Sequence, residues 1–411
     1  MSTTIGKFSF EHLYRWITSY FYQKTIPVKV SVVRAKSQIR VLFILHELES
    51  WKTENLYLAM VNHPRFCPIL GVTYDIEKHS KLDKLTEYLE NNSYPYEIMK
   101  EKSNYDKIKP DIVFYQKPYP GTIPYFLDNR LHYDTLFCDV NYAFNSIDNY
   151  WSTKQPLYKD AWLLFFENEL AAKSRRLFLR NGGKNIVVTG LPIQDQLLID
   201  KSNYSDPWLE QPGKKRIIYA PHHSIENLHL EDIGISTFLE NGEFMLQMAE
   251  KYKESVQWIF KPHPHLYSKL ATIWGSEKTD EYYRLWDNRN YSQIALGKYD
   301  AIFKYSDAMI HDCCSFRIEY QYTCNPALYL LHNGYKPNHL NQFAQQAFDL
   351  HYKGESHEDI EQFIKMVIDG KDTRNKERLI FYKQHLVPPH KKSACQNIIN
   401  AILGEEEYRS H

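Results

Sequence analysis

From about residue 40 onward, the spacing of apolar residues predicts short strands separated by amphipathic helices. Apolar runs typical of buried parallel strands occur at 41–45, 68–72, 112–115, 162–166 and 186–188. Helical patterns at about 53–62, 81–91 and 169–181 separate several of these runs. Strands that alternate with crossover helices indicate one open parallel sheet in this part of the chain.

A second series of the same kind follows a polar stretch at 200–215, where the periodicity breaks down. Strands are predicted at 217–220, 257–261, 308–311 and 327–331, and helices at about 236–252, 265–274 and 315–323; after Asn341 the pattern is helical to the end. We therefore predict an α/β protein of two doubly wound, Rossmann-like lobes that face a central cleft, the GT-B arrangement. A helical segment is expected at 1–38, an N-terminal lobe at 39–205, and a C-terminal lobe with terminal helices at 206–411.

The first forty residues combine an apolar stripe with positive charge. The stripe has helical spacing and consists of Leu13, Trp16, Ile17, Tyr20 and Phe21. Seven basic residues and one acidic residue give residues 1–40 a net charge of +6. Two interpretations remain open: a helix that packs on its own domain, or peripheral contact of residues 8–40 with an anionic membrane. No apolar run approaches the ~20 residues of a spanning helix.

Composition narrows the class of protein. The 411 residues favour two domains, and 50 basic against 50 acidic residues give no net charge, which argues against a nucleic-acid partner. Six cysteines without a signal peptide, two of them adjacent at Cys313 and Cys314, indicate a reducing cytoplasm rather than a disulfide scaffold. No Walker loop, G-x-G-x-x-G or G-x-S-x-G motif occurs, so the common nucleotide hydrolases, dinucleotide oxidoreductases and serine hydrolases are not indicated.

Three predicted strands of the second lobe end in polar residues, and ligands of parallel sheets bind beyond such ends. In chain order these residues are His222 and His223, then Lys261 and His263, then Asp312, Ser315 and Arg317. All three exits are expected on one rim. Imidazole and ammonium groups beside a helix start at Ser315 are typical of a diphosphate site. The alternatives are structural histidines, an ordinary helix cap by Ser315, and an Arg317 that pairs with an acid.

A metal site would have to use residues that do not have the spacing of a structural zinc site. These are His222, His263, His311, Cys313 and Cys314. We therefore expect no metal and no other cofactor.

The second lobe also carries three motifs of a known family: IIYAPHHSI at 217–225, FKPHP at 260–264 and SDAMIHDCCSFRIEYQYTCNPALYLL at 306–331. These resemble the CDP-glycerol glycerophosphotransferases, which include teichoic acid and capsule enzymes. The resemblance implies a GT-B fold, a CDP-alcohol donor held by the C-terminal lobe, and transfer of glycerol phosphate with release of CMP. By the same resemblance His263, Asp312 and Ser315 are site residues, while Cys314 replaces a serine of the family pattern.

In the first lobe the sequence departs from the family, because it lacks the W-H-G element whose histidine is regarded as the base for the acceptor hydroxyl. Asp139 and His132 are the alternatives for that base. The expected partners are a nucleotide-activated donor and a polysaccharide or lipid-linked acceptor, so 39–205 would be the acceptor lobe and 206–411 the donor lobe. In the expected reaction His263, His222 and Asp312 are catalytic, and His223, Lys261, Ser315 and Arg317 bind the donor.

Two other functions remain open. A glycosyltransferase of capsule or lipopolysaccharide synthesis that uses a nucleotide sugar would share the same fold. A non-catalytic member that binds the donor or a polymer would account for the missing W-H-G element.

Overall fold

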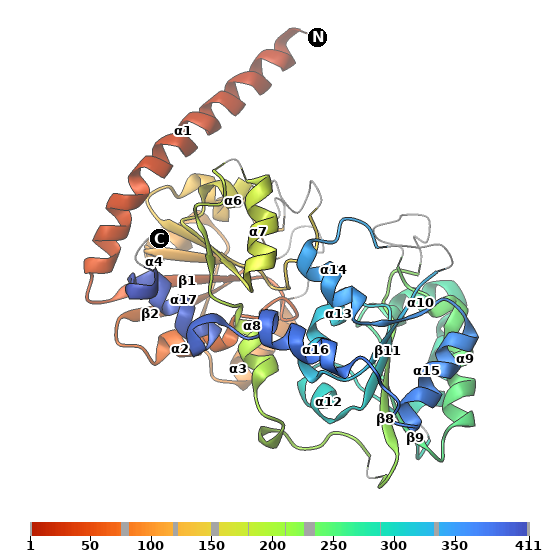
Figure 1. Ribbon diagram of the computed structural model, residues 1–411. Helices are drawn as coiled ribbons and strands as arrows, with labels where there is room; N and C mark the ends of the chain where they lie inside the picture. Colours follow the sequence, from red (N-terminus) through yellow and green to blue (C-terminus); the bar gives the residue numbers. More distant parts are fainter. Residues whose placement is uncertain are drawn as a thin grey trace. The chain divides into compact units, whose positions relative to one another are not determined.

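The computed structural model describes residues 2–74, 82–117, 122–148, 156–179, 181–209, 211–225, 235–287, 289–332 and 337–408, with the side chains of 2–12, 14–16 and 156 left aside. It contains two compact units, each with a parallel sheet of its own (Figure 1). Unit 1 comprises Met1–Asp195 and Pro388–His411, and unit 2 comprises Gln196–Val387. The cleft expected between the lobes stays a prediction.

The sheet of unit 1 has seven parallel strands in the order β3-β2-β1-β4-β5-β6-β7. In chain order the strands are β1 Ile39–Leu45, β2 Phe66–Val72, β3 Tyr96–Ile98, β4 Ile112–Tyr115, β5 Leu136–Val140, β6 Leu163–Phe166 and β7 Ile186–Val188. All five strands predicted for this lobe are present. The strands that the pattern did not assign are the short edge strand β3 and the buried β5.

Helices cover both faces of this sheet. They are α1 Ser2–Ala35, α2 Glu54–Val61, α3 Asp83–Asn91, α4 Lys102–Ile108, α6 Pro156–Asp160, α7 Glu169–Phe178 and α17 Ala394–Leu403. Helix α8 Pro192–Leu198 begins in unit 1 and ends in unit 2. Residue 81, the start of one predicted helix, lies outside the described residues. Successive strand residues face opposite sides: Leu42 and Ile44 pack in one core cluster with Tyr22 of α1, whereas Phe43 stacks on Phe114 of β4 and meets Tyr57 of α2.

Helix α1 packs with a different face from the one that its apolar stripe suggested. Ser19, Tyr22, Val30 and Val33 are buried. The exposed residues include four of the predicted stripe and two beyond it: Leu13 (54%), Ile17 (38%), Tyr20 (46%), Phe21 (63%), Val28 (67%) and Val32 (56%). The side chain of Trp16 lies outside the described residues. Helix α1 therefore packs on its own unit, as one of the two interpretations expected, but the four described members of the predicted stripe are exposed and do not form the packed face.

Unit 2 contains a six-stranded parallel sheet in the order β10-β9-β8-β11-β12-β13. Its strands are β8 Lys215–Ala220, β9 Val256–Phe260, β10 Ser292–Ile294, β11 Ala308–His311, β12 Ala327–Leu330 and β13 Tyr352–Gly354. The four predicted strands are confirmed. Strand β13 corrects the expectation of a purely helical chain after Asn341, because a polar three-residue edge strand gives no apolar run.

The helices of unit 2 also lie on both faces of its sheet (Figure 1). They are α9 Phe238–Lys251, α10 Leu266–Trp274, α11 Ser276–Asp287, α12 Asp300–Tyr305, α13 Phe316–Glu319, α14 Gln342–Asp349, α15 His357–Ile368 and α16 Asn375–Phe381, followed by a π-helical turn at Tyr382–Leu386. Ile217 and Tyr219 of β8 pack in a cluster with residues of α9, α11 and α15, and Ile218 packs in the opposite cluster with residues of α12 and α13.

The C-terminal segment packs with unit 1, whereas the sequence pattern had grouped all of 206–411 in one lobe. The Asp195 carboxylate accepts hydrogen bonds from the backbone N–H groups of Ala394 (2.6 Å) and Cys395 (2.8 Å) at the start of α17. At the other end of α17, Arg34 donates to the carbonyls of Ala401 (3.0 Å) and Ile402 (2.9 Å). These contacts join positions about 200 and 370 residues apart, which local patterns cannot reveal.

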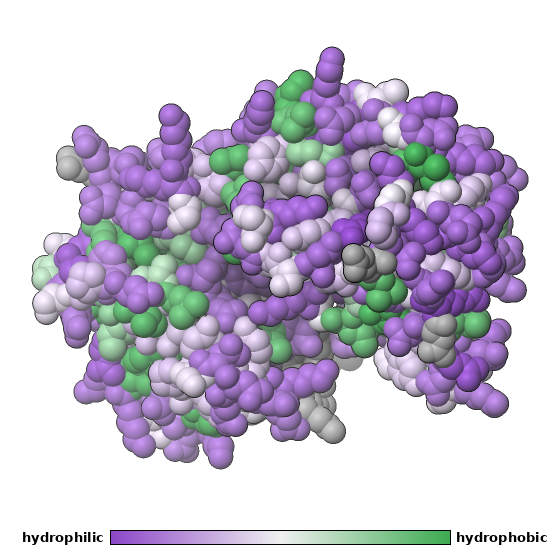
Figure 2. Space-filling view, turned by 90° about the horizontal axis from the view of Figure 1, so that it is seen from below, coloured by the Kyte–Doolittle hydropathy of each residue, from purple (hydrophilic) through white to green (hydrophobic). Residues whose placement is uncertain are grey.

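No helix in the described part of the chain has the length and apolar character needed to cross a bilayer. The surface seen from below is mostly hydrophilic, and its hydrophobic residues form small separate groups (Figure 2).

Candidate active site

The three polar exits of unit 2 lie side by side, because β9, β8 and β11 are adjacent and parallel. The backbone N–H of His263 donates to the Pro221 carbonyl (3.1 Å), which joins the β9 exit to the β8 exit. The Cys313 thiol donates to the Ala220 carbonyl (3.3 Å), which joins the β11 exit to β8. The predicted convergence of the three exits on one rim is confirmed.

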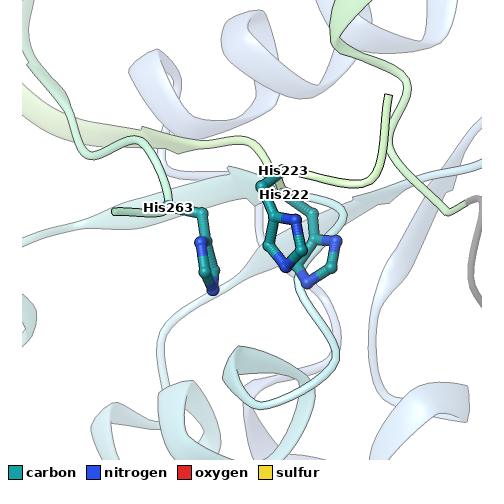
Figure 3. Close-up of side chains that lie close together, drawn as sticks. All are labelled: His222, His223 and His263. Carbon is teal, nitrogen blue, oxygen red and sulfur yellow. The ribbon is translucent and has the colours of Figure 1, made fainter. Parts of the chain in front are cut away.

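Imidazole rings gather at this rim. Ring centroids lie 4.3 Å apart for His222 and His223, 4.1 Å for His223 and His263, and 5.1 Å for His222 and His263. The three rings point to the same side of the strand exits (Figure 3). His265 lies 5.6 Å from His223 and extends the group. All three labelled rings are half-buried, so they are held in place yet open to a ligand.

Two of these rings are neutral at neutral pH. Burial, assisted by the neighbouring His223 and Lys269, lowers the pKa of His222 to about 3. Burial, assisted by the other imidazoles and Lys261, lowers the pKa of His263 to about 2. A neutral imidazole still has one N–H to donate, so the pair can bind a phosphate by hydrogen bonds without carrying charge.

Asp312 holds the rim together through both carboxylate oxygens. Oδ1 accepts from the His222 backbone N–H (2.5 Å), and Oδ2 accepts from the Thr237 backbone N–H (2.7 Å) and hydroxyl (3.0 Å). Its side chain is fully buried, and burial raises its pKa to about 6. The structure therefore shows a positioning contact for Asp312, which had been expected to be catalytic.

The other predicted donor-binding residues differ in how they are placed. Ser315 is exposed at the start of α13, and the expectation of an ordinary helix cap is wrong, because its hydroxyl makes no cap hydrogen bond. Arg317 is buried, donates to the Tyr329 hydroxyl (3.0 Å) and packs over Phe348, so it points into the core of unit 2. Lys261 is also buried and donates to the Gly297 carbonyl (3.1 Å).

In unit 1 the two alternatives for the acceptor base occupy different positions. His132 precedes β5, on the amino side of the strands; its Nε2 bonds the Phe126 carbonyl (2.6 Å) and its ring stacks on Tyr105 at 3.7 Å. Asp139 lies near the carboxyl end of β5, where parallel sheets bind ligands. Burial raises the pKa of Asp139 to about 7, although the Arg175 charge acts in the other direction.

Two further strand-end groups of unit 1 were missed. Glu167 directly follows β6 and accepts from the backbone N–H (2.7 Å) and side-chain amide (2.9 Å) of Asn145; burial raises its pKa to about 7. Lys117 follows β4 and pairs with Glu47 after β1, and burial lowers its pKa to about 8. The donor residues were selected because ligands of parallel sheets bind beyond the carboxyl ends of the strands. The same criterion would have selected Glu167 and Lys117.

A comparison with family models decides the family of the chain. The model of the CDP-glycerol:poly(glycerophosphate) glycerophosphotransferases matches residues 172–404, more than half of the chain. The chain belongs to this family. It is therefore a transferase enzyme, and the resemblance seen in the three sequence motifs is confirmed. A comparison with curated proteins found no match.

Solved structures agree with the fold of this glycerophosphotransferase. MnaA of S. aureus, solved with UDP, has a TM-score of 0.60 and 17% identity over 90% of this chain and 98% of its own. The wall teichoic acid polymerase TagF has a TM-score of 0.58 and 12% identity over 97% and 99%. The UDP-GlcNAc 2-epimerase of Neisseria meningitidis has a TM-score of 0.57 and 13% identity over 89% and 99%. At these identities the likeness shows the fold, and the predicted GT-B class is confirmed.

Proposed function

We propose that this glycerophosphotransferase moves a glycerol-phosphate, or related polyol-phosphate, group from a CDP-activated donor onto a teichoic-acid-like or other cell-surface polysaccharide acceptor. The observation that carries the proposal is the convergence of His222, His223 and His263 on one rim of unit 2. Family membership supports the donor class. The acceptor class is supported by the family description and by the shared fold with the wall teichoic acid polymerase TagF.

In the proposed reaction an acceptor hydroxyl oxygen attacks the phosphorus that carries the polyol. A new P–O bond forms, the bond from that phosphorus to the bridging oxygen breaks, and CMP leaves with the bridging oxygen. N–H groups of His222 and His263 stabilise the charge that develops on the diphosphate oxygens. No covalent intermediate and no cofactor is required, and positioning of the two substrates supplies most of the rate.

Asp139 is the group that we assign as base for the acceptor hydroxyl. A general base works best when its pKa lies near the operating pH, and burial brings that of Asp139 to about 7. Its Oδ1 accepts no hydrogen bond within the described part of the chain. His132 is not proposed, because its Nε2 is engaged by Phe126 and it lies on the amino side of the strands.

We also propose that the enzyme works in the cytoplasm, peripherally on the inner face of an anionic membrane. All six cysteines are free thiols, as expected in a reducing compartment. The exposed apolar residues of α1 recur at Leu13, Ile17, Tyr20, Val28 and Val32, at spacings of three, four and eight, and so form one stripe along the helix. Such a helix binds a membrane by lying in its surface.

A donor screen tests the proposed function. CDP-glycerol, CDP-ribitol, UDP-sugars and CMP-sialic acid would be compared by thermal shift, followed by an assay of CMP release with a polymer acceptor. We expect stabilisation by a CDP-alcohol and loss of CMP release in His263→Ala, while the variant keeps its circular dichroism spectrum. Stabilisation by a UDP-sugar alone would replace the proposal by a nucleotide-sugar glycosyltransferase. Donor binding without CMP release with any acceptor would indicate a non-catalytic member.

A further inference from the structure

The histidine cluster has two possible ligands, and they require different protonation of the rings. One nitrogen from each of His222, His223 and His263 lies within 4.8 Å of the other two, close enough to gather around a metal ion. A metal takes a lone pair from each ring, whereas a diphosphate takes a hydrogen bond from an N–H group. The two readings are therefore separated by which nitrogen of each neutral ring carries the proton.

The surroundings of His222 place that proton on Nε2. Its Nδ1 lies 3.3 Å from the Ser224 backbone nitrogen, whose N–H can only donate, and 2.9 Å from the Ser224 hydroxyl oxygen. The same hydroxyl oxygen accepts from the Ile235 backbone N–H (3.1 Å), so its own hydrogen is available to the ring. A neutral imidazole whose Nδ1 accepts hydrogen bonds carries its proton on Nε2.

The Nδ1 atom of His263 also accepts a hydrogen bond, but from a different donor. Its Nδ1 accepts from the backbone N–H of His265 (3.1 Å), which follows two residues later in the turn that starts α10. His263 therefore also carries its proton on Nε2. Two rings from separate strand exits are held in the same tautomer, His263 by a backbone N–H and His222 by the hydroxyl and, at a longer distance, the backbone N–H of Ser224. Both rings point to the same side (Figure 3).

We propose that His222 and His263 form a pair of fixed, neutral Nε2–H donors for the diphosphate of the donor substrate, and that Ser224 is the positioning residue that sets the tautomer of His222. The identity of the diphosphate ligand rests on the proposed function. In this tautomer neither ring has a lone pair to give to a cation, because Nδ1 is an acceptor of N–H groups and Nε2 holds the proton. The cluster is therefore an anion site rather than a metal site.

Replacing each histidine by an amide side chain tests which ring nitrogen donates the hydrogen bond to the diphosphate. The Gln amide nitrogen falls near the position of Nε2 and that of Asn near Nδ1, and neither amide can take up a proton as imidazole does. Calorimetric titration with CDP-glycerol would compare His263→Gln, His263→Asn and His263→Ala, with the same set at His222. We expect the Gln variants to bind within about threefold of wild type and the Asn and Ala variants about tenfold or more weakly, as for a lost hydrogen bond to a charged ligand. A Gln variant as weak as Ala at both positions would overturn the proposal.

Nuclear magnetic resonance of the ¹⁵N-histidine-labelled protein tests the tautomers without any substrate. We expect the Nε2–H pattern for His222 and His263 in the wild-type protein. Ser224→Ala removes the hydroxyl at 2.9 Å and leaves only the backbone N–H at 3.3 Å, so it should shift His222 toward a mixture of tautomers. His263, whose Nδ1 accepts only from the backbone N–H of His265, is the internal control, and Ser224→Thr should restore the wild-type pattern. An Nδ1–H pattern at either ring, or a joint shift of all three rings on addition of ZnCl₂, would overturn the proposal.

The results that would contradict the donor assignment differ from those that would contradict the tautomer assignment. If CDP-glycerol does not bind but CDP does, with the expected order of the amide variants, the donor assignment falls and the tautomer assignment stands. If CDP-glycerol binds and is turned over but the Nδ1–H pattern is found, the proposed function stands and this inference falls.

Discussion

The fully buried His311 should make the stability of the protein depend on pH, and replacing it should remove a defined part of that dependence. His311 is the last residue of β11 and lies against the rings of Tyr329 and His351. Burial lowers its pKa from 6.5 to about 3. Between these values the unfolded chain binds a proton that the folded protein does not. The stabilisation of the folded protein that comes from a neutral His311 is therefore fully present above pH 6.5. It is lost as the pH falls toward 3.

The size of the effect follows from the two pKa values. Between about pH 7.5 and pH 5, protonation of a histidine of pKa 6.5 in the unfolded state lowers the free energy of unfolding by about 2 kcal/mol. Phenylalanine has a ring of similar shape and does not titrate. Between pH 7.5 and pH 5, the free energy of unfolding of His311→Phe should therefore fall by about 2 kcal/mol less than that of wild type.

Urea denaturation at the two pH values measures the difference directly. If His311→Phe and wild type lost the same free energy of unfolding between pH 7.5 and pH 5, the conclusion that His311 is held neutral by burial would be refuted.

Three further predictions concern the reaction and the membrane. Asp139→Asn should lower turnover about a hundredfold or more and abolish the rise of activity with pH near 7; an unchanged pH profile would exclude Asp139 as the base. Phe21→Ser with Ile17→Ser should weaken sedimentation with anionic vesicles about tenfold or more while leaving CMP release in solution intact, because both side chains are exposed; unaltered sedimentation would exclude the α1 stripe as the contact. Asp312→Ala leaves three donors without their acceptor, so the melting temperature and the donor affinity should fall together; lost turnover at wild-type stability and affinity would make Asp312 catalytic instead.

Most of the fold was predictable because the central strands are buried on both faces and form continuous apolar runs. Strands such as Ile112–Tyr115 and Ala308–His311 were located to the residue. The edge strands Tyr96–Ile98, Ser292–Ile294 and Tyr352–Gly354 were not found, because three residues at an edge are too few and too exposed to form such a run. The docking of α17 on unit 1 was also hidden, since it depends on contacts between residues far apart in the chain.

The donor rim was predictable for a topological reason, because adjacent parallel strands end on the same edge of their sheet. The roles of single residues were less accessible. The sequence cannot show that both oxygens of Asp312 bind the backbone of His222 and Thr237, because Thr237 lies 75 positions away. Nor can it show that Arg317 points into the core, since a side chain in the first turn of a helix can face either way.

A structure of the protein crystallised with CDP-glycerol tests the central claim most directly. The account predicts diphosphate oxygens within hydrogen-bond distance of the Nε2 atoms of His222 and His263. A diphosphate bound elsewhere, with these two rings facing solvent or a metal ion, would contradict it.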